Sequence, residues 1–266
     1  MVLETLFPVK KIIQHPLDMY IFSTVISFVS IFIANLIFPG VSTGKIIILF
    51  ITIGVSPMIY FILEREEESE RKIAESRLKQ GFFERYEDTI WLFTLFFLGV
   101  FTAIFIFSVF SPQDAVEKVF EDQILEIERI STLSSGSFSA SKALELIVKN
   151  NLRVMGLSFF LSFLLGVGSV VILSWNASIL ALYLASFLRK GLISEFLTRT
   201  ITLIPHAPIE ILAYFVAGIA GGILSMGVIK EKILSREFSL VFKDSLILLA
   251  LSVFLVLIGA LFEVFV

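Results

Sequence analysis

Residues 91–110 read WLFTLFFLGVFTAIFIFSVF, a stretch without a single charged side chain. About 20 apolar residues in a helix cross the roughly 30 Å hydrocarbon core of a bilayer, so this stretch predicts a transmembrane helix. Strands of a membrane barrel would alternate apolar and polar side chains, and this stretch does not alternate. Its backbone amides must therefore form their hydrogen bonds within a helix.

Further apolar runs lie on both sides of this stretch. They are Tyr20–Phe38, Ile46–Leu63, Leu152–Leu173, Ala177–Leu188, Pro208–Ile229 and Leu246–Phe262. Hydrophobic residues make up 57% of the 266 residues and the mean hydropathy is +0.95, which is too apolar for a soluble domain. We predict an all-α fold: a polytopic transmembrane helical bundle of about seven spans, with a short re-entrant or interfacial helix and amphipathic loop helices.

Composition excludes several kinds of function. The net charge is −3 with acidic and basic groups interspersed, so we expect no nucleic-acid binding. The absence of cysteine excludes disulfides, thiolate nucleophiles and cysteine-based metal sites. Glu66–Arg71 matches the Glu-Glu-x-x-x-Arg box of some intramembrane proteases, but it lies in a charged stretch without the companion histidine motifs. We therefore expect neither an enzyme nor a cofactor.

The distribution of Lys and Arg predicts the orientation of the spans. More of these residues flank the predicted inner segments than the outer ones when the N-terminus is cytoplasmic, which places the C-terminus outside. We divide this multi-pass cell-membrane protein into two parts. Residues 1–89 hold an interfacial helix over Leu3–Leu17, two spans and a charged cytoplasmic hairpin. Residues 90–266 hold five spans and an outward amphipathic loop, 111–151.

Two extramembrane segments have helical patterns. Glu64–Thr89 predicts a solvated helix that continues the second span, with Glu67–Arg71, Glu68–Lys72 and Glu75–Lys79 at i,i+4 spacing and a break at Gly81. This charged helix either keeps the cytoplasmic side of the protein hydrated or binds a partner protein. In the outward loop, Val116, Phe120, Ile124, Ile127 and Ile130 recur at helical spacing. That helix and a second one from Ala143 either lie on the lipid surface or cover the bundle.

The segment Ala177–Glu210 breaks the pattern of long spans. Its first run is short for a full crossing and ends before Gly191, and a short helix over Leu192–Ile204 follows with the pair Glu195–Arg199. Interrupted helices at membrane depth persist only where protein or water satisfies the freed backbone groups. Such interruptions also indicate binding sites in transporters.

The candidate polar site lies around this interruption. Its residues are Pro205, His206, Pro208, Glu210, Asn150, Asn151 and Asn176. Pro208 suits a first helical turn, where Glu210 is favoured by the helix dipole and has His206 within reach. One alternative is that these residues only stabilise the start of the helix. The other is that they bind or transfer protons or ions, because ionisable side chains inside a membrane usually have a function. One His and one Glu are too few ligands for zinc, so we expect no metal. The asparagines are expected to cap helices or to join them.

The sixth run carries a face of small residues. They are Ala213, Ala217, Gly218, Gly221, Gly222 and Ser225. Small side chains let helix backbones approach closely in lipid. The face therefore serves either internal packing or a homodimer seam.

Several sequence stretches resemble a known family. They are YEDTIW at 86–91, VKNNLR at 148–153, IPHAPIEILA at 204–213 and AGIAGG at 217–222, together with Glu263 near the end of the closing span. From Phe82 to Val266 the chain resembles the stage II sporulation protein M family, whose usual form has Gly where this chain has Ala207. The resemblance implies an integral membrane protein of the cell envelope whose namesake acts with partner proteins during engulfment.

We therefore predict a membrane scaffold or assembly protein that presents partner-binding helices on both faces. The alternative is a transporter or channel that uses the region around His206 and Glu210. The expected partners are the lipid bilayer and either a second copy of the chain or other membrane proteins.

Overall fold

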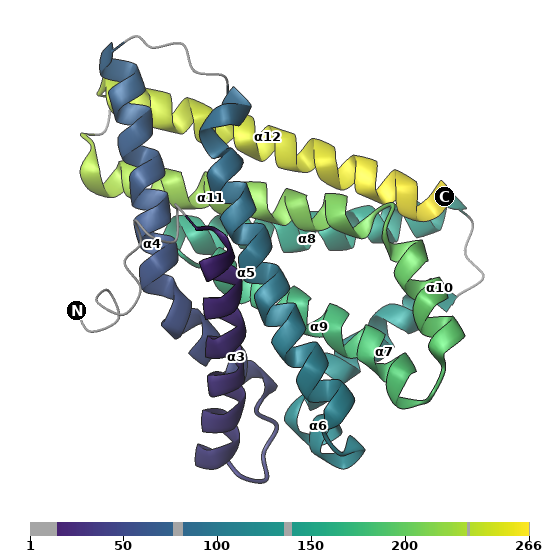
Figure 1. The fold of residues 1–266 in the computed structure, drawn as a ribbon. Coiled ribbons are helices and arrows are strands. Elements are labelled where there is room, and N and C mark those ends of the chain that lie inside the picture. Colours follow the sequence, from purple (N-terminus) through teal and green to yellow (C-terminus); the bar gives the residue numbers. More distant parts are fainter. Residues whose placement is uncertain (1–14, 77–81, 136–139, 233–234, 266) are drawn as a thin grey trace.

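The computed structural model describes residues 15–76, 82–135, 140–232 and 235–265, which are helical almost throughout and contain no strand (Figure 1). The helices are α3 (Leu17–Ile37), α4 (Gly44–Ser76), α5 (Phe82–Phe110), α6 (Gln113–Val119), α7 (Glu121–Ser135), α8 (Ala140–Leu165), α9 (Ser169–Arg189), α10 (Ile193–Leu203), α11 (Ala207–Lys230) and α12 (Arg236–Phe265). The predicted all-α class is confirmed. The predicted interfacial helix over Leu3–Leu17 lies almost entirely outside the described residues.

Six of these helices are long and apolar enough to cross a membrane: α3, α4, α5, α9, α11 and α12. In α4 and α5 the apolar part is Gly44–Glu66 and Tyr86–Phe110. Helix α8 is also long, but its N-terminal part carries Lys142, Glu145, Lys149 and Arg153. The multi-pass architecture follows from these lengths and compositions.

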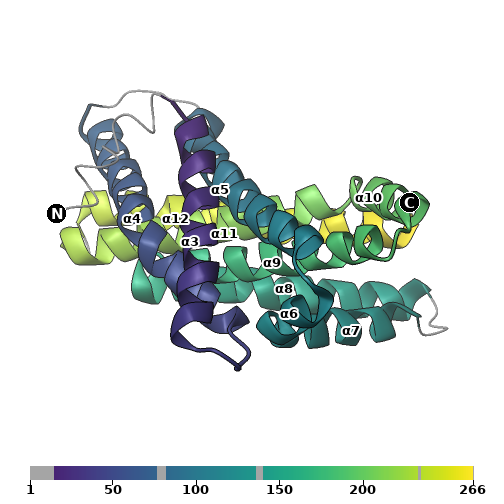
Figure 2. The same ribbon diagram turned by 60° about the horizontal axis from the view of Figure 1, so that its bottom comes forward.

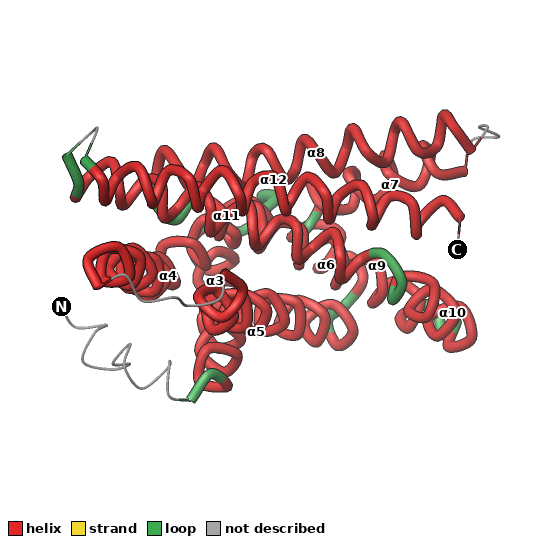
Figure 3. Tube along the Cα trace, turned by 90° about the horizontal axis from the view of Figure 1, so that it is seen from above, coloured by secondary structure: helices red, strands yellow, loops and turns green. Residues whose placement is uncertain are grey.

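The helices form two groups that cross steeply. Figure 1 shows α8, α11 and α12 running side by side, while α3, α4 and α5 run across them, and Figure 3 shows the same crossing from above. Helix α11 lies at the centre, and every residue from Ala213 to Gly227 is buried. A helix that is apolar all round is stable only when neighbours surround it, as they do here.

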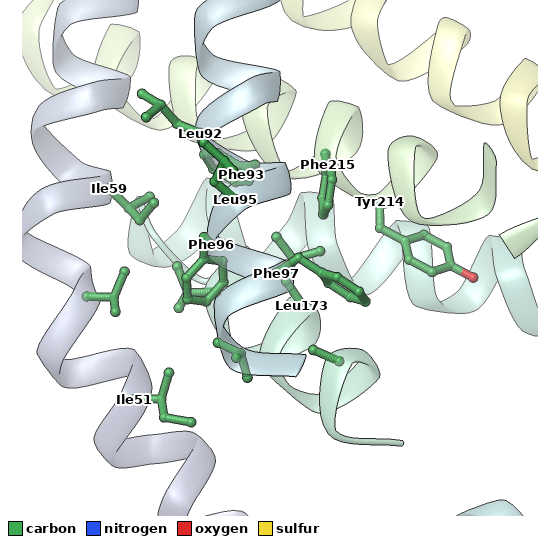
Figure 4. Close-up of a cluster of buried hydrophobic side chains, with 14 of the residues drawn as sticks. Ile51, Ile59, Leu92, Phe93, Leu95, Phe96, Phe97, Leu173, Tyr214 and Phe215 are labelled. Atoms are coloured by element: carbon green, nitrogen blue, oxygen red, sulfur yellow. The ribbon is translucent and has the colours of Figure 1, made fainter. Parts of the chain in front are cut away.

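Aromatic side chains fill the crossing between α5 and α11. Figure 4 shows Phe93 and Phe97 of α5 directed toward Phe215 of α11. The ring centroids lie 6.2 and 5.9 Å from that of Phe215, both in edge-on geometry. Such pairs add to the stabilisation that comes from burial alone.

The prediction of one span over Leu152–Leu173 is wrong. Helix α8 ends at Leu165 and α9 begins at Ser169, because Gly166 turns the chain with a φ of +75°. A side chain at Gly168 would meet the carbonyl oxygen of Leu161 at 2.2 Å, so this turn needs glycine at both positions. As a result α9 is a full 21 residues long, and the expectation that the fifth run is short for a crossing is also wrong.

The expectation that Glu64–Thr89 is a solvated segment is wrong for its membrane-proximal ends. Glu66 is buried and accepts a hydrogen bond of 2.6 Å from the hydroxyl of Thr89, and Tyr86 is buried too. Helix α4 does continue past the apolar stretch as far as Ser76, as predicted. Gly81 lies outside the described residues, as do the side chains at 67, 71, 72, 75 and 79.

Polar contacts join helix ends at two separate places in the bundle. At one, the amide of Thr43 donates to the carbonyl of Val119 at 3.1 Å, and the guanidinium of Arg189 donates to the carbonyls of Ser108 and Ser111. Figure 2 shows α6 and α7 at this place, next to the connection between α3 and α4. At the other, Lys230 pairs with Glu64 at 2.8 Å.

Candidate functional site

A histidine and a proline occupy the start of α11. His206 precedes the first helical residue, and Pro208 lies in the first turn, as predicted. The backbone amides of Ile209 and Glu210 donate to the carbonyl of His206 at 3.0 and 3.1 Å. Proline costs nothing at this position because its missing amide would have no partner inside the helix. The turn places the Glu210 side chain between α8 and α12.

Asn151 of α8 joins two residues of α11. Its amide nitrogen donates to Glu210 Oε1 at 2.5 Å, and its amide oxygen accepts from the hydroxyl of Tyr214 at 2.8 Å. Asn151 and Tyr214 are 5% and 4% exposed, so these bonds form away from solvent. Buried polar groups need partners, and here an asparagine satisfies a carboxyl and a phenol on successive turns of one helix.

Helix α12 completes the site on the other side of Glu210. A Cβ atom added at Gly259 would lie 2.6 Å from Glu210 Cγ, so glycine makes room for this side chain. Glu263 lies one turn further along α12, and its carboxyl hydrogen-bonds that of Glu210. Helix α12 thus places a second carboxyl group directly beside that of Glu210.

Exposure decreases along this network. Glu263 is exposed on α12, Glu210 is partly buried, and Asn151 and Tyr214 are buried. Ser158 of α8 continues the polar contacts inward by donating to the carbonyl of Tyr214 at 2.9 Å. We call Asn151, Glu210, Tyr214 and Glu263 the carboxyl network. It joins three helices and leads from the surface of the bundle into its interior.

His206 lies beside the network without joining it. Its imidazole is partly buried, and burial lowers its pKa below the ordinary value. Within the described chain, the side-chain bonds of Glu210 go to Asn151 and Glu263 rather than to His206. No group of three or more His, Asp or Glu side chains in the described ranges is arranged to hold a metal ion.

The structure separates the other residues of the predicted site. Asn150 donates a long bond of 3.4 Å to its neighbour Asn151. Asn176 does not mark the end of the fourth span: it lies within α9 and donates to the carbonyl of Ile172 in its own helix. Tyr214 and Gly259 were missed by the sequence reasoning. Their i,i+4 spacing from Glu210 and Glu263 was the available signal, since residues four apart share a helix face.

The small-residue face of α11 packs inside the chain. A Cβ atom at Gly218 would lie 2.5 Å from that of Ser169, and one at Gly221 would lie 2.2 Å from the carbonyl oxygen of Phe159. One at Gly222 would meet Leu63 of α4 at 2.6 Å. Ala213, Ala217 and Ser225 are buried as well. The face is therefore in contact with α4, α8 and α9 and is not open to a second copy.

Comparison with known proteins places this architecture in a family. Residues 92–266 match the family model described as Stage II sporulation protein M. The match spans most of α5 and everything up to α12, including the whole carboxyl network, whereas α3 and α4 lie outside it. No curated protein and no solved structure matches the chain. The matched region is about two thirds of the sequence, and the chain belongs to the stage II sporulation protein M family.

Proposed function

We propose that this protein is a membrane scaffold that holds a platform, residues 113–135 of α6 and α7, in a fixed position beside the bilayer for a partner protein. The distribution of Lys and Arg predicts that this platform lies outside the cell membrane. The observation that carries the proposal is the way the platform is attached to the spans.

The inner side of the platform is held by burial and by polar contacts. Val116 and Phe120 are 5% and 0% exposed and pack into the core. Asp122 accepts from Lys45 at 2.5 Å and from Ser42 at 3.2 Å. These contacts join it to the start of α4. A surface that is already ordered loses little conformational entropy on binding.

The exposed part of α7 combines apolar and charged side chains. Leu125 is 57% exposed, and Glu128 and Arg129 are exposed too. Ile130, at the edge of the apolar stripe, is 37% exposed. Arg129 also forms a two-pronged contact with Glu126, which holds its guanidinium in place. Protein interfaces typically place such apolar anchors within a polar rim. This arrangement supports a protein partner rather than lipid.

The test is site-specific photocrosslinking in native membranes. A photoreactive amino acid at Leu125 should give one protein adduct of defined mass. The adduct should disappear when Ile130→Asp is added and persist when Thr198→Asp, an exposed position on α10, is added instead. Adducts with lipid alone, or adducts indifferent to Ile130→Asp, would refute a partner-binding platform.

A second candidate function is transfer of protons through the carboxyl network. The observation that favours it is the pair of carboxyl groups, Glu210 and Glu263, next to the buried amide of Asn151. Carboxyl groups of this kind mark proton pathways in membrane proteins. Purified protein in liposomes with a trapped pH indicator should pass protons, and Glu210→Gln should abolish the flux. Glu126→Gln, on the platform, is the matched control. Flux equal to that of empty liposomes would exclude this function.

A further inference from the structure

Helix α10 has three distinct sides. Phe196, Thr200 and Leu203 are partly buried on the side that packs toward the bundle, where the ring of Phe196 lies 6.2 Å from that of Phe105. A second side carries Glu195 and Arg199, which pair at 3.7 Å. The third side is apolar and open.

The open side is formed by residues that recur with helical spacing. They are Ile193, Leu197, Ile201 and Ile204, which are 63%, 53%, 65% and 62% exposed. At about 100° per residue, these four fall on one narrow stripe, and Glu195, Arg199 and Thr202 fall on the opposite one. In water such a stripe of large aliphatic side chains is unfavourable, so something apolar covers it.

The position of α10 in the chain identifies what covers this stripe. Gly191, with a φ of +71°, reverses the chain directly after the span α9, and α11 begins four residues after α10 ends. The short connections keep α10 close to the ends of α9 and α11, which are both long and apolar enough to cross a membrane. Figures 1 and 3 show it near the C-terminal end of α12, where Leu261, Phe262 and Phe265 are also exposed.

We propose that α10 is a membrane-surface helix whose apolar stripe is immersed in the bilayer crossed by α9 and α11. Glu195 and Arg199 then face water and lipid headgroups. Opposed apolar and charged faces on a helix of low overall hydrophobicity are typical of helices that bind membrane interfaces. The bilayer is the occupant because short connections join α10 to a candidate span on each side.

The absence of cysteine from the native chain makes this proposal directly testable. Single cysteines are placed at Leu197 and Ile201 on the apolar stripe, and at the neighbouring Thr198 and Thr202 as matched controls. The protein is reconstituted in vesicles of phosphatidylcholine and phosphatidylglycerol and treated with a membrane-impermeant maleimide. Labelling after denaturation in SDS measures the total thiol, so that misfolded variants are recognised.

The two faces should react at different rates. The cysteines at 197 and 201 should label at least about tenfold more slowly than those at 198 and 202, because an apolar surrounding disfavours the reactive thiolate. A fluorophore at 197 or 201 should also be quenched by spin-labelled lipids, and one at 198 or 202 should not. Equal labelling of both faces in folded protein overturns the proposal. So does a disulfide dimer through Ile201→Cys without lipid quenching, since that assigns the stripe to a second copy.

Discussion

The side-chain amide of Asn151 on α8 donates a hydrogen bond of 2.5 Å to the carboxyl of Glu210 on α11, although 59 positions separate them in sequence. The same asparagine accepts from Tyr214. Asn151 therefore connects α8 with two successive turns of α11. Glu210 in turn packs on Gly259, so the effect of this asparagine extends to α12.

Replacing Asn151 by alanine should destabilise the protein. The change removes the bonds to Glu210 and Tyr214 and leaves the buried hydroxyl of Tyr214 without its acceptor, at a cost of about 1–2 kcal/mol in membrane surroundings. The free energy of unfolding in mixed micelles measures this loss. Asn150→Ala is the control, because its amide makes only a 3.4 Å bond to Asn151. Equal effects of the two substitutions would contradict the role assigned to Asn151.

Gly221→Ala should be far more damaging than the same substitution in α8. The added methyl group would lie 2.2 Å from the carbonyl oxygen of Phe159, so α8 and α11 must separate. Overpacking of this kind costs about 1–3 kcal/mol. Gly156→Ala is the matched control, since beyond the adjacent backbone of its own helix nothing lies within 4 Å of the new Cβ. Thermal unfolding in detergent measures both variants. A Gly221→Ala protein as stable as Gly156→Ala would rule out the close approach of these helices.

Arg189→Gln should loosen the end of α5. The guanidinium of Arg189 donates to the carbonyls of Ser108 and Ser111, which are otherwise among the unpaired carbonyls at a helix end. Hydrogen bonds from a charged group contribute about 1.5–3 kcal/mol, reduced here by partial exposure. Hydrogen exchange at residues 108–119 should speed up. Lys190→Gln, at the exposed neighbouring position, should leave exchange unchanged, and equal acceleration in both variants would point to a general charge effect.

Acidification should destabilise the start of α11 through His206. Burial lowers the pKa of this imidazole, so the folded protein favours the neutral form. The stability that depends on neutral His206 is present above the ordinary value of 6.5 and is lost as the pH falls through that value toward the lowered one. The unfolding temperature of the native protein should therefore drop more between about pH 7.5 and 5.5 than that of His206→Gln.

The comparison of variants isolates His206 from the nearby acids. Glu210 and Glu263 are present in both proteins, so their titration cancels in the difference. His15→Gln, at an exposed histidine, should follow the native protein. If His206→Gln shows the same drop as the native protein, His206 does not contribute to the pH dependence.

Local sequence signals predicted the region around α10 well. The helix over Leu192–Ile204, the pair Glu195–Arg199 and the place of Pro208 in a first turn all depend on spacing within one helix. The same reasoning failed at Gly166. Hydropathy continues without a break from Leu152 to Leu173, because a turn that is buried in protein needs no polar residues.

The sequence by itself determined that this is a membrane protein, that its fold is all-α, and to which family it belongs. These properties can be recognised in stretches of consecutive residues: the length of the apolar runs, the lack of apolar–polar alternation within them, and short motifs. Only the tertiary structure decided that Glu210 pairs with Asn151 and Glu263, that Glu66 is buried against Thr89, and that the small residues of α11 face α4, α8 and α9. The physical reason is that these contacts join helices distant in sequence, and hydropathy records how apolar each helix is but not which helix lies beside it.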